Sequence, residues 1–270
     1  MTLLIHSMAE FADLILSVLE KAGARRLAEI GAEFGGMSAI LAAHAERHAG
    51  HLTSIDPAAK PEFAEWLAAN PHVTHVAAPS LETIAGLREV DAWIVDGDHN
   101  YYTVRHELSA IAERCRGDGK PLLALLHDVA WPCARRDCYY APDRIPQEWR
   151  HAHDWDGGVV PGEATLITGR GFRGLGQFAW ALHEGGPANG VLTAVEDFIT
   201  AEEAAGASLA FAQVPAVFGL GILFDITAFW APDVAALVAP FHDNKLLATL
   251  ERNRLANYLR VIELQDQLAA

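Results

Sequence analysis

Cysteine is scarce in this chain. The 270 residues include three, Cys115, Cys133 and Cys138, and no two of them form a C-x-x-C pair. An odd count without such a pair argues against a disulfide framework and against a four-cysteine zinc site. Free thiols suit a reducing compartment, so we expect a cytoplasmic protein.

Positive charge and long apolar runs are also in short supply. Twenty Lys and Arg stand against 35 Asp and Glu, which gives a net charge of -15. Such a surface repels phosphate backbones, so we expect no nucleic-acid partner. No apolar run reaches the ~18 residues that a membrane span needs. Glu10 and Asp13 interrupt the apolar N-terminal segment, which indicates an amphipathic helix and neither a leader peptide nor a membrane partner.

Apolar runs typical of buried strands alternate with helical periodicities over the first half of the chain. We expect helices at 6–22, 36–48, 61–69, 80–87 (with Ser80 as its N-cap) and 102–116, and strands at 25–31, 52–56, 73–77, 91–96 and 121–128. The strand runs do not alternate polar with apolar residues, so both faces of the sheet should be covered. The fold class is therefore α/β: a Rossmann-like, doubly wound, mostly parallel sheet of about seven strands with helices on both faces.

The whole chain reads as one domain, 1–270, with a sizeable core because 51% of its residues are hydrophobic. Its expected parts are an N-terminal helix (1–24), a ligand-binding core (25–128), an irregular Pro- and Gly-rich lid (129–190), the end of the sheet (191–228) and a C-terminal helix (240–270). In the 191–228 part we expect a helix at 191–205 and strands at 208–214 and 219–225. Leu255, Leu259 and Ile262 form a stripe on the last helix, for core packing or a homodimer.

Polar residues gather where the expected strands end, which is where doubly wound folds bind ligands. The first strand ends in Glu29-Ile30-Gly31-x-x-x-Gly35-Gly36, whose glycines let backbone approach a ligand or simply make a tight turn. This is not the G-x-G-x-x-G of nicotinamide enzymes, because Glu33 stands at the second glycine and would repel a pyrophosphate. Asp56 ends the second strand and either accepts ribose hydroxyls or caps the next helix.

The next two strands end in Asp96-Gly97-Asp98-His99-Asn100 and in His127-Asp128. Neighbouring strand ends lie about 5 Å apart, so Asp96 and Asp128 could share a divalent cation. Histidine is the side chain that most often serves as a general base, so His99 suits that role. Two alternatives stay open: an Asx turn formed by Asp98 and Asn100, and a hydrogen bond from His127 to the backbone.

The expected lid carries rings and guanidinium groups that suit a sugar or aromatic acceptor. They are Trp131, Arg135, Arg136, Tyr139, Tyr140 and Trp149. The other interpretation is that the rings pack the lid onto the domain and the arginines are solvated.

Together the glycine loop, Asp56, VDGDHNYYTVRHEL and LLALLHD resemble the class I S-adenosylmethionine-dependent methyltransferases. Within that class the group is the one that contains catechol-type and macrolide-sugar O-methyltransferases and cephalosporin hydroxylase-like proteins. The resemblance covers roughly residues 25–128. It implies that S-adenosylmethionine is held by Glu29, Gly31, Gly35, Ser38, Asp56, Ser80 and Asp96. It also implies a divalent metal (Mg, Mn or Fe) on Asp96, His127 and Asp128, although His127 stands where the metal-dependent relatives have a carboxylate.

The implied reaction is methyl transfer to a hydroxyl of a small molecule, a glycoside or another specialised metabolite. Asp96 and His99 are the implied catalytic residues: the metal lowers the hydroxyl pKa and His99 takes the proton. Two alternatives remain, iron-dependent hydroxylase-like chemistry and a catalytically silent S-adenosylmethionine-binding subunit. The sequence does not identify the acceptor molecule itself.

Overall fold

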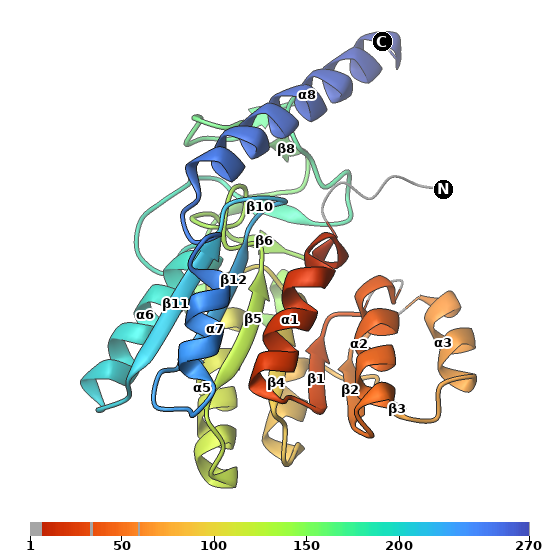
Figure 1. The fold of residues 1–270 in the computed structure, drawn as a ribbon. Coiled ribbons are helices and arrows are strands. Elements are labelled where there is room, and N and C mark those ends of the chain that lie inside the picture. The colour runs from red at the N-terminus through yellow and green to blue at the C-terminus, as the bar shows by residue number, and fades with distance from the viewer. Residues whose placement is uncertain (1–6, 33–34, 59, 270) are drawn as a thin grey trace.

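A seven-stranded sheet forms the centre of the molecule, in the order β11-β12-β5-β4-β1-β2-β3 (Figure 1). The computed structural model describes residues 7–32, 35–58 and 60–269. The strands are β1 (Arg26–Ile30), β2 (His51–Ile55), β3 (Val73–Val76), β4 (Ala92–Val95), β5 (Leu123–His127), β11 (Leu209–Val214) and β12 (Leu220–Asp225). β12 runs antiparallel to both its neighbours, and the pairings from β5 to β3 are all parallel. The predicted fold class is confirmed, with each predicted strand within two residues of its observed bounds.

Helices cover both faces of this sheet. They are α1 (Ala12–Ala22), α2 (Gly36–Arg47), α3 (Pro61–Ala68), α4 (Ser80–Thr83), α5 (Tyr101–Asp118), α6 (Val191–Ala204), α7 (Ala231–Val238) and α8 (Lys245–Ala269). Side chains of α1, α2 and α7 share one buried cluster, and those of α5 and α6 share the other. Among the described residues, no helix is both long and apolar enough to cross a membrane.

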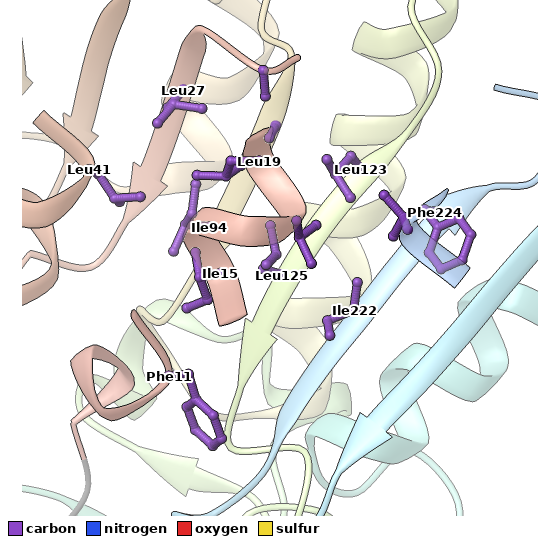
Figure 2. Packing of buried hydrophobic residues seen from close by; sticks show 14 of the residues in the cluster. Phe11, Ile15, Leu19, Leu27, Leu41, Ile94, Leu123, Leu125, Ile222 and Phe224 are labelled. Carbon is purple, nitrogen blue, oxygen red and sulfur yellow. The ribbon is translucent and has the colours of Figure 1, made fainter. Parts of the chain in front are cut away.

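Successive residues of the central strands point to opposite faces, and both faces are buried. On β5, Leu123 and Leu125 belong to the cluster beneath α1, while Ala124 and Leu126 belong to the other. Figure 2 shows Leu19 of α1 and its neighbours packed beside Leu123 and Leu125. Each such side chain contributes about 1.5–3 kcal/mol when buried, so these two layers hold the central strands in place.

The helix expected at 80–87 is shorter than predicted, and Ser80 is not its N-cap. Pro79 holds the cap position, and α4 passes at Ile84 into the 3-10 turn η2 (Ile84–Gly86). The Ser80 hydroxyl donates instead to Oε1 of Glu107 on α5, at 2.5 Å. Ser80 is thus the first residue of α4, and its side chain is turned toward α5.

The N-terminal helix begins with a 3-10 turn, η1 (Met8–Phe11), before α1. Ser7 caps this turn, its side chain accepting from the Ala9 N–H at 3.2 Å. The part of the prediction that falls on residues 1–6 lies outside the described residues.

The C-terminal region has one helix more than predicted. α7 has a proline in its first turn, and its eight residues are too few to show a clear helical period in the sequence. The tail helix starts at Lys245 and not at residue 240, because the Asn244 side chain accepts from the N–H groups of Leu246 and Leu247.

The segment 129–190, called the insertion below, lies beyond the carboxyl ends of the central strands (Figure 1). Its strands are β6 (Cys138–Tyr139), β7 (His153–Asp154), β8 (Gly157–Gly158), β9 (Ile167–Thr168) and β10 (Ala179–Ala181). They form a β6-β10-β7 sheet and a β8-β9 pair. The 3-10 turns η3 (Pro142–Arg144) and η4 (Gln147–Trp149) lie between β6 and β7. Strands of two or three residues show no period, so they could not be predicted from the sequence.

Candidate functional site

The carboxyl ends of β1, β2, β4 and β5 meet at one edge of the sheet, as predicted. Gly31 follows β1 with φ +89°, and a Cβ on it would lie 2.1 Å from the carbonyl oxygen of Asp96. Its N–H donates to the carbonyl of Ile55 at 2.9 Å. Glycine is therefore required at position 31 by the neighbouring strand end, whatever ligand approaches it.

Asp56 holds the glycine loop in place. Its Oδ2 accepts from the Ala32 N–H at 2.9 Å and its Oδ1 from the Ala58 N–H at 2.7 Å. Gly35 occupies the N-cap of α2 with φ +80°, where a Cβ would lie 2.7 Å from the ring of Phe63. The carboxylate is part-exposed, so a ribose contact stays a prediction beside this local role. Glu33, on which the argument against a pyrophosphate depends, lies outside the described residues.

Glu29 and Ser38 lie in the interior beneath this loop. Glu29 is 1% exposed, and its Oε2 accepts from the hydroxyls of Ser38 at 2.6 Å and Ser54 at 2.8 Å. Burial raises the pKa of Glu29 to about 7, against these two hydrogen bonds that lower it. The three side chains tie β1 to α2 and β2, and their contact with a cofactor remains a prediction.

Two acids and two imidazoles form what we call the strand-end cluster: Asp96, His99, His127 and Asp128. Nδ1 of His127 lies 3.1 Å from Asp96 Oδ1 and 3.2 Å from Asp128 Oδ2. Nε2 of His99 lies 3.3 Å from Asp128 Oδ2. The Asp96 and His99 side chains keep 25% and 13% of their surface exposed, so they form the accessible side of the cluster.

Both ring nitrogens of His127 bond to protein oxygens. Nε2 lies 2.9 Å from the carbonyl of Val217, which can only accept, so this nitrogen carries a proton. Nδ1 faces the two carboxylates and donates as well. Burial opposes the charged form, yet the carboxylates of Asp96 and Asp128 outweigh it and raise the His127 pKa well above its usual value. His127 is thus an imidazolium with no nitrogen left for a metal, in contrast to its predicted role.

Asp98 and Asn100 follow the Asx-type alternative. Asn100 caps α5, its side chain accepting from the Thr103 N–H at 2.9 Å. Asp98 Oδ2 accepts from the Thr103 hydroxyl at 3.1 Å, and burial raises the pKa of this carboxyl. Asp98 therefore bonds to the first turn of α5.

Three members of the strand-end cluster have the donor chemistry of a divalent metal site. Asp96, His99 and Asp128 each offer one ligand atom, and these atoms lie within 4.8 Å of one another. Two carboxylates and one imidazole suit manganese, ferrous iron or zinc. This group contains two of the three predicted metal ligands, Asp96 and Asp128, together with His99 and without His127, and a bound metal stays a prediction.

Of the predicted acceptor-binding residues in the insertion, Tyr140 comes nearest to the cluster. Its ring meets the ring of His99 edge to face at 5.8 Å and that of Phe178 at 5.7 Å. Tyr140 is 48% exposed, so it offers an aromatic face beside His99. Trp131 packs edge to face on Phe218 at 6.1 Å.

The two arginines and Tyr139 have partners within the protein. Arg136 is 1% exposed and donates to the carbonyls of Ala181 at 2.6 Å and Ala164 at 2.8 Å. Tyr139 is fully buried and donates to Asp137 at 2.7 Å. The remaining two side chains also contact the protein. Arg135 pairs with Glu196 at 2.5 and 2.7 Å, and the ring of Trp149 stacks on that of Tyr101. The packing alternative therefore describes Tyr139 and Trp149, whereas Arg136 is buried and not solvated as that alternative expects.

Sequence reasoning missed Glu107, which lies fully buried on α5 beside Ser80. Burial raises its pKa to about 8, against the hydrogen bond from Ser80. Its Oε2 has no hydrogen-bond partner among the described residues. One signal was available: Glu107 shares the apolar helical face of Val104, Leu108 and Ile111, where a charged residue is unusual.

The sheet, with its antiparallel β12, is a Rossmann-like α/β arrangement. Residues 28–129 match a family model described as a methyltransferase domain. The predicted resemblance is confirmed over that segment. No curated protein matches the chain.

Solved structures with a similar arrangement include two methyltransferases. An O-methyltransferase of Bacillus cereus in complex with SAH shares 12% identity at a TM-score of 0.47, over 82% of this chain and 83% of that one. An SAH-bound methyltransferase of Podospora anserina shares 14% identity at a TM-score of 0.47, over 81% and 79%.

Proposed function

We propose that this protein is an S-adenosylmethionine-dependent methyltransferase that methylates a hydroxyl of a small molecule, with His99 as the general base. The observation that carries the proposal is the meeting, at one edge of a methyltransferase-type domain, of the Gly31 loop, the strand-end acid Asp56 and the His99–Asp128 pair. A glycoside or another specialised metabolite is the acceptor class we infer.

The cofactor would lie along the loop after β1. Among the described residues, no side chain caps the N-terminus of α2, so its first N–H groups remain for a ligand carboxylate. Asp56 keeps part of its surface exposed at the end of β2, where it can accept from ribose hydroxyls. S-adenosylmethionine supplies the methyl group as an electrophile when it is bound there.

His99 is arranged to accept a proton. If Nε2 donates to Asp128 Oδ2 at 3.3 Å, Nδ1 carries the free lone pair. His99 then takes the proton of the acceptor hydroxyl as its oxygen attacks the methyl carbon. Asp128 stabilises the resulting imidazolium, as the orienting acid does in other acid–histidine pairs. The aromatic face of Tyr140 lies beside this imidazole and suits an aromatic or sugar ring.

A metal-assisted form of the reaction would use Asp96, Asp128 and His99 as ligands. A metal there would act as a Lewis acid on the acceptor hydroxyl. The two forms compete for His99, because an imidazole bound to a metal is a poor base. We favour the base form because the positive charge of His127 already balances the carboxylates of Asp96 and Asp128.

Calorimetric titration of S-adenosylmethionine and S-adenosylhomocysteine, with and without EDTA, tests the cofactor. We expect both to bind the wild-type protein and to bind Asp56→Ala at least about tenfold more weakly, because the ribose hydroxyls lose a charged acceptor. Absence of binding by both compounds under both conditions would overturn the proposal.

Transfer of a labelled methyl group to a panel of catechols and glycosides then tests the base. We expect His99→Gln to lower kcat by about 10²–10⁴-fold while leaving S-adenosylhomocysteine affinity nearly unchanged. His153→Gln, a histidine of β7 outside the strand-end cluster, is the matched control and should keep its activity. Full activity of His99→Gln would refute the role of His99 as the general base. Activity lost in EDTA and restored by manganese would instead support the metal-assisted form.

A further inference from the structure

A second group of ligand-type side chains lies at the opposite edge of the sheet. Glu20 belongs to the last turn of α1, and His44 and His48 lie at the end of α2. Both helices end where β1 and β2 begin, away from the carboxyl ends of the strands (Figure 1). Each of the three side chains offers one ligand atom, and these atoms lie within 4.8 Å of one another.

His44 is held in the tautomer that a metal ligand needs. It is 2% exposed, and its Nε2 lies 2.9 Å from the carbonyl of Ala24, to which it must donate. Nδ1 therefore carries a lone pair, and it has no hydrogen-bond partner among the described residues. Metal-bound histidines characteristically donate their other N–H to a backbone carbonyl in this way.

His48 stands one helical turn further along the same face. Its ring centroid lies 4.5 Å from that of His44, at an interplanar angle of 41°. Nε2 of His48 is also buried without a partner in the described part of the chain. Buried nitrogens without a hydrogen-bond partner destabilise the folded state unless a ligand binds them.

Glu20 supplies the negative charge. Its Oε1 accepts from Arg47 at 3.3 Å, and both side chains of this pair are more than half exposed. Such an exposed pair is worth at most about 1 kcal/mol, so the carboxylate can turn toward the histidines at small cost.

We propose that Glu20, His44 and His48 form a zinc-type transition-metal site, unrelated to the strand-end cluster. Two imidazole nitrogens exclude magnesium and calcium, which prefer oxygen ligands, and favour zinc with a water as the fourth ligand. With bonds of about 2.0–2.1 Å, tetrahedral zinc needs its donors roughly 3.3 Å apart. The donor atoms now lie within 4.8 Å of one another. Rotation of the exposed Glu20 and the part-exposed His48 side chains can shorten these separations to the tetrahedral value. The bound ion joins the ends of α1 and α2 and stabilises the fold.

Zinc chloride titrated into EDTA-stripped full-length protein tests the site, by calorimetry and by thermal unfolding. We expect wild type to bind zinc and to gain Tm, as any ligand of the folded state produces. His48→Ala and Glu20→Gln should each weaken this binding by about 10–100-fold, because each removes one ligand. Glu20 is exposed and glutamine has nearly the same shape, so Glu20→Gln should not disturb the folding of the protein.

Three further variants distinguish this site from other zinc-binding groups and test the role of Glu20. Asp128→Asn removes a donor of the strand-end cluster and should leave the zinc-induced Tm gain of the second site intact. His72→Ala removes another histidine with an unpartnered buried nitrogen, outside the group, and should bind zinc as wild type does. Arg47→Gln removes the cation that competes for Glu20 and should tighten binding. Zinc binding that survives in both His48→Ala and Glu20→Gln, or disappears in Asp128→Asn alone, would overturn the proposal.

Discussion

Glu107 and Glu29 are two buried carboxyl groups whose protonation couples the site to pH. Glu107 is fully buried and Glu29 is 1% exposed, and burial is the main cause that raises their pKa values to about 8 and about 7. Each is a neutral acid in mildly acidic solution and is forced to ionise as the solution becomes alkaline. The ionised form is poorly solvated in the interior, so ionisation lowers the free energy of unfolding.

The sign of the effect follows from the proton balance. The pKa of Glu107 is about 8 in the folded protein against 4.5 ordinarily, so between these values the folded chain binds a proton that the unfolded chain releases. Its contribution to stability is complete below pH 4.5 and is lost as the pH rises through about 8.

Glu107→Gln stays neutral at every pH. We expect its free energy of unfolding to exceed that of wild type by about 1–3 kcal/mol at pH 8.5 and to match it near pH 4.5. Urea denaturation at both pH values measures this difference. Glu113→Gln, on the exposed side of the same helix, is the control and should change little at either pH. A Glu107→Gln effect that is the same at both pH values would contradict the prediction.

At the scale of elements, α8 supports the loop between β11 and β12. Glu251 Oε1 accepts from the Phe218 N–H at 3.1 Å, and Arg254 lies over the Phe218 ring at 5.2 Å. Val217 and Phe218 have φ of +43° and +64°, which costs of order 1–3 kcal/mol for residues with a side chain. The same loop presents the Val217 carbonyl to His127, so α8 indirectly helps to position the strand-end cluster.

Glu251→Ala should therefore lower the free energy of unfolding by about 1–3 kcal/mol, because the buried Phe218 N–H loses its acceptor. Glu263→Ala is the matched control on the same helix, since its pair with Arg260 lies at the surface and contributes about 0–1 kcal/mol. Urea denaturation of both variants measures the difference. Equal effects of the two substitutions would show that α8 does not hold the loop through Glu251.

At the scale of the whole molecule, α8 has one buried side and one exposed apolar side. Leu255 is 5% exposed, and Arg173 of the insertion binds Asp266 at 2.6 Å, so one side packs on the chain itself. The other side exposes Leu246, Leu250, Val261, Leu264 and Leu268. An exposed stripe of this length suits a two-fold contact with the same helix of a second copy, although it is not the predicted stripe, whose Leu255 packs on the chain itself.

Sedimentation velocity tests this dimer. We expect wild type to sediment as a dimer and the double substitution Val261→Asp with Leu264→Asp to sediment as a monomer, because two charges on each copy would face each other across the contact. Gln265→Asp changes an exposed polar neighbour and should remain dimeric. A wild-type monomer at micromolar concentration would contradict the prediction.

The sequence by itself determined the order of strands and helices and the edge of the sheet where polar residues gather. Buried parallel strands are continuous apolar runs, and their carboxyl ends necessarily meet. For this reason the proximity of Asp96, His99 and Asp128 was predictable, and the structure confirms it.

The tertiary structure alone decided where each side chain turns. His127 bonds to a carbonyl 90 residues away, and Arg136 is buried against carbonyls 27 to 45 residues further along the chain. Glu20, His44 and His48 meet because two helices end side by side. Contacts between distant segments leave no period in a sequence, so tautomers, burial and ligand sets of this kind become visible only once the chain is folded.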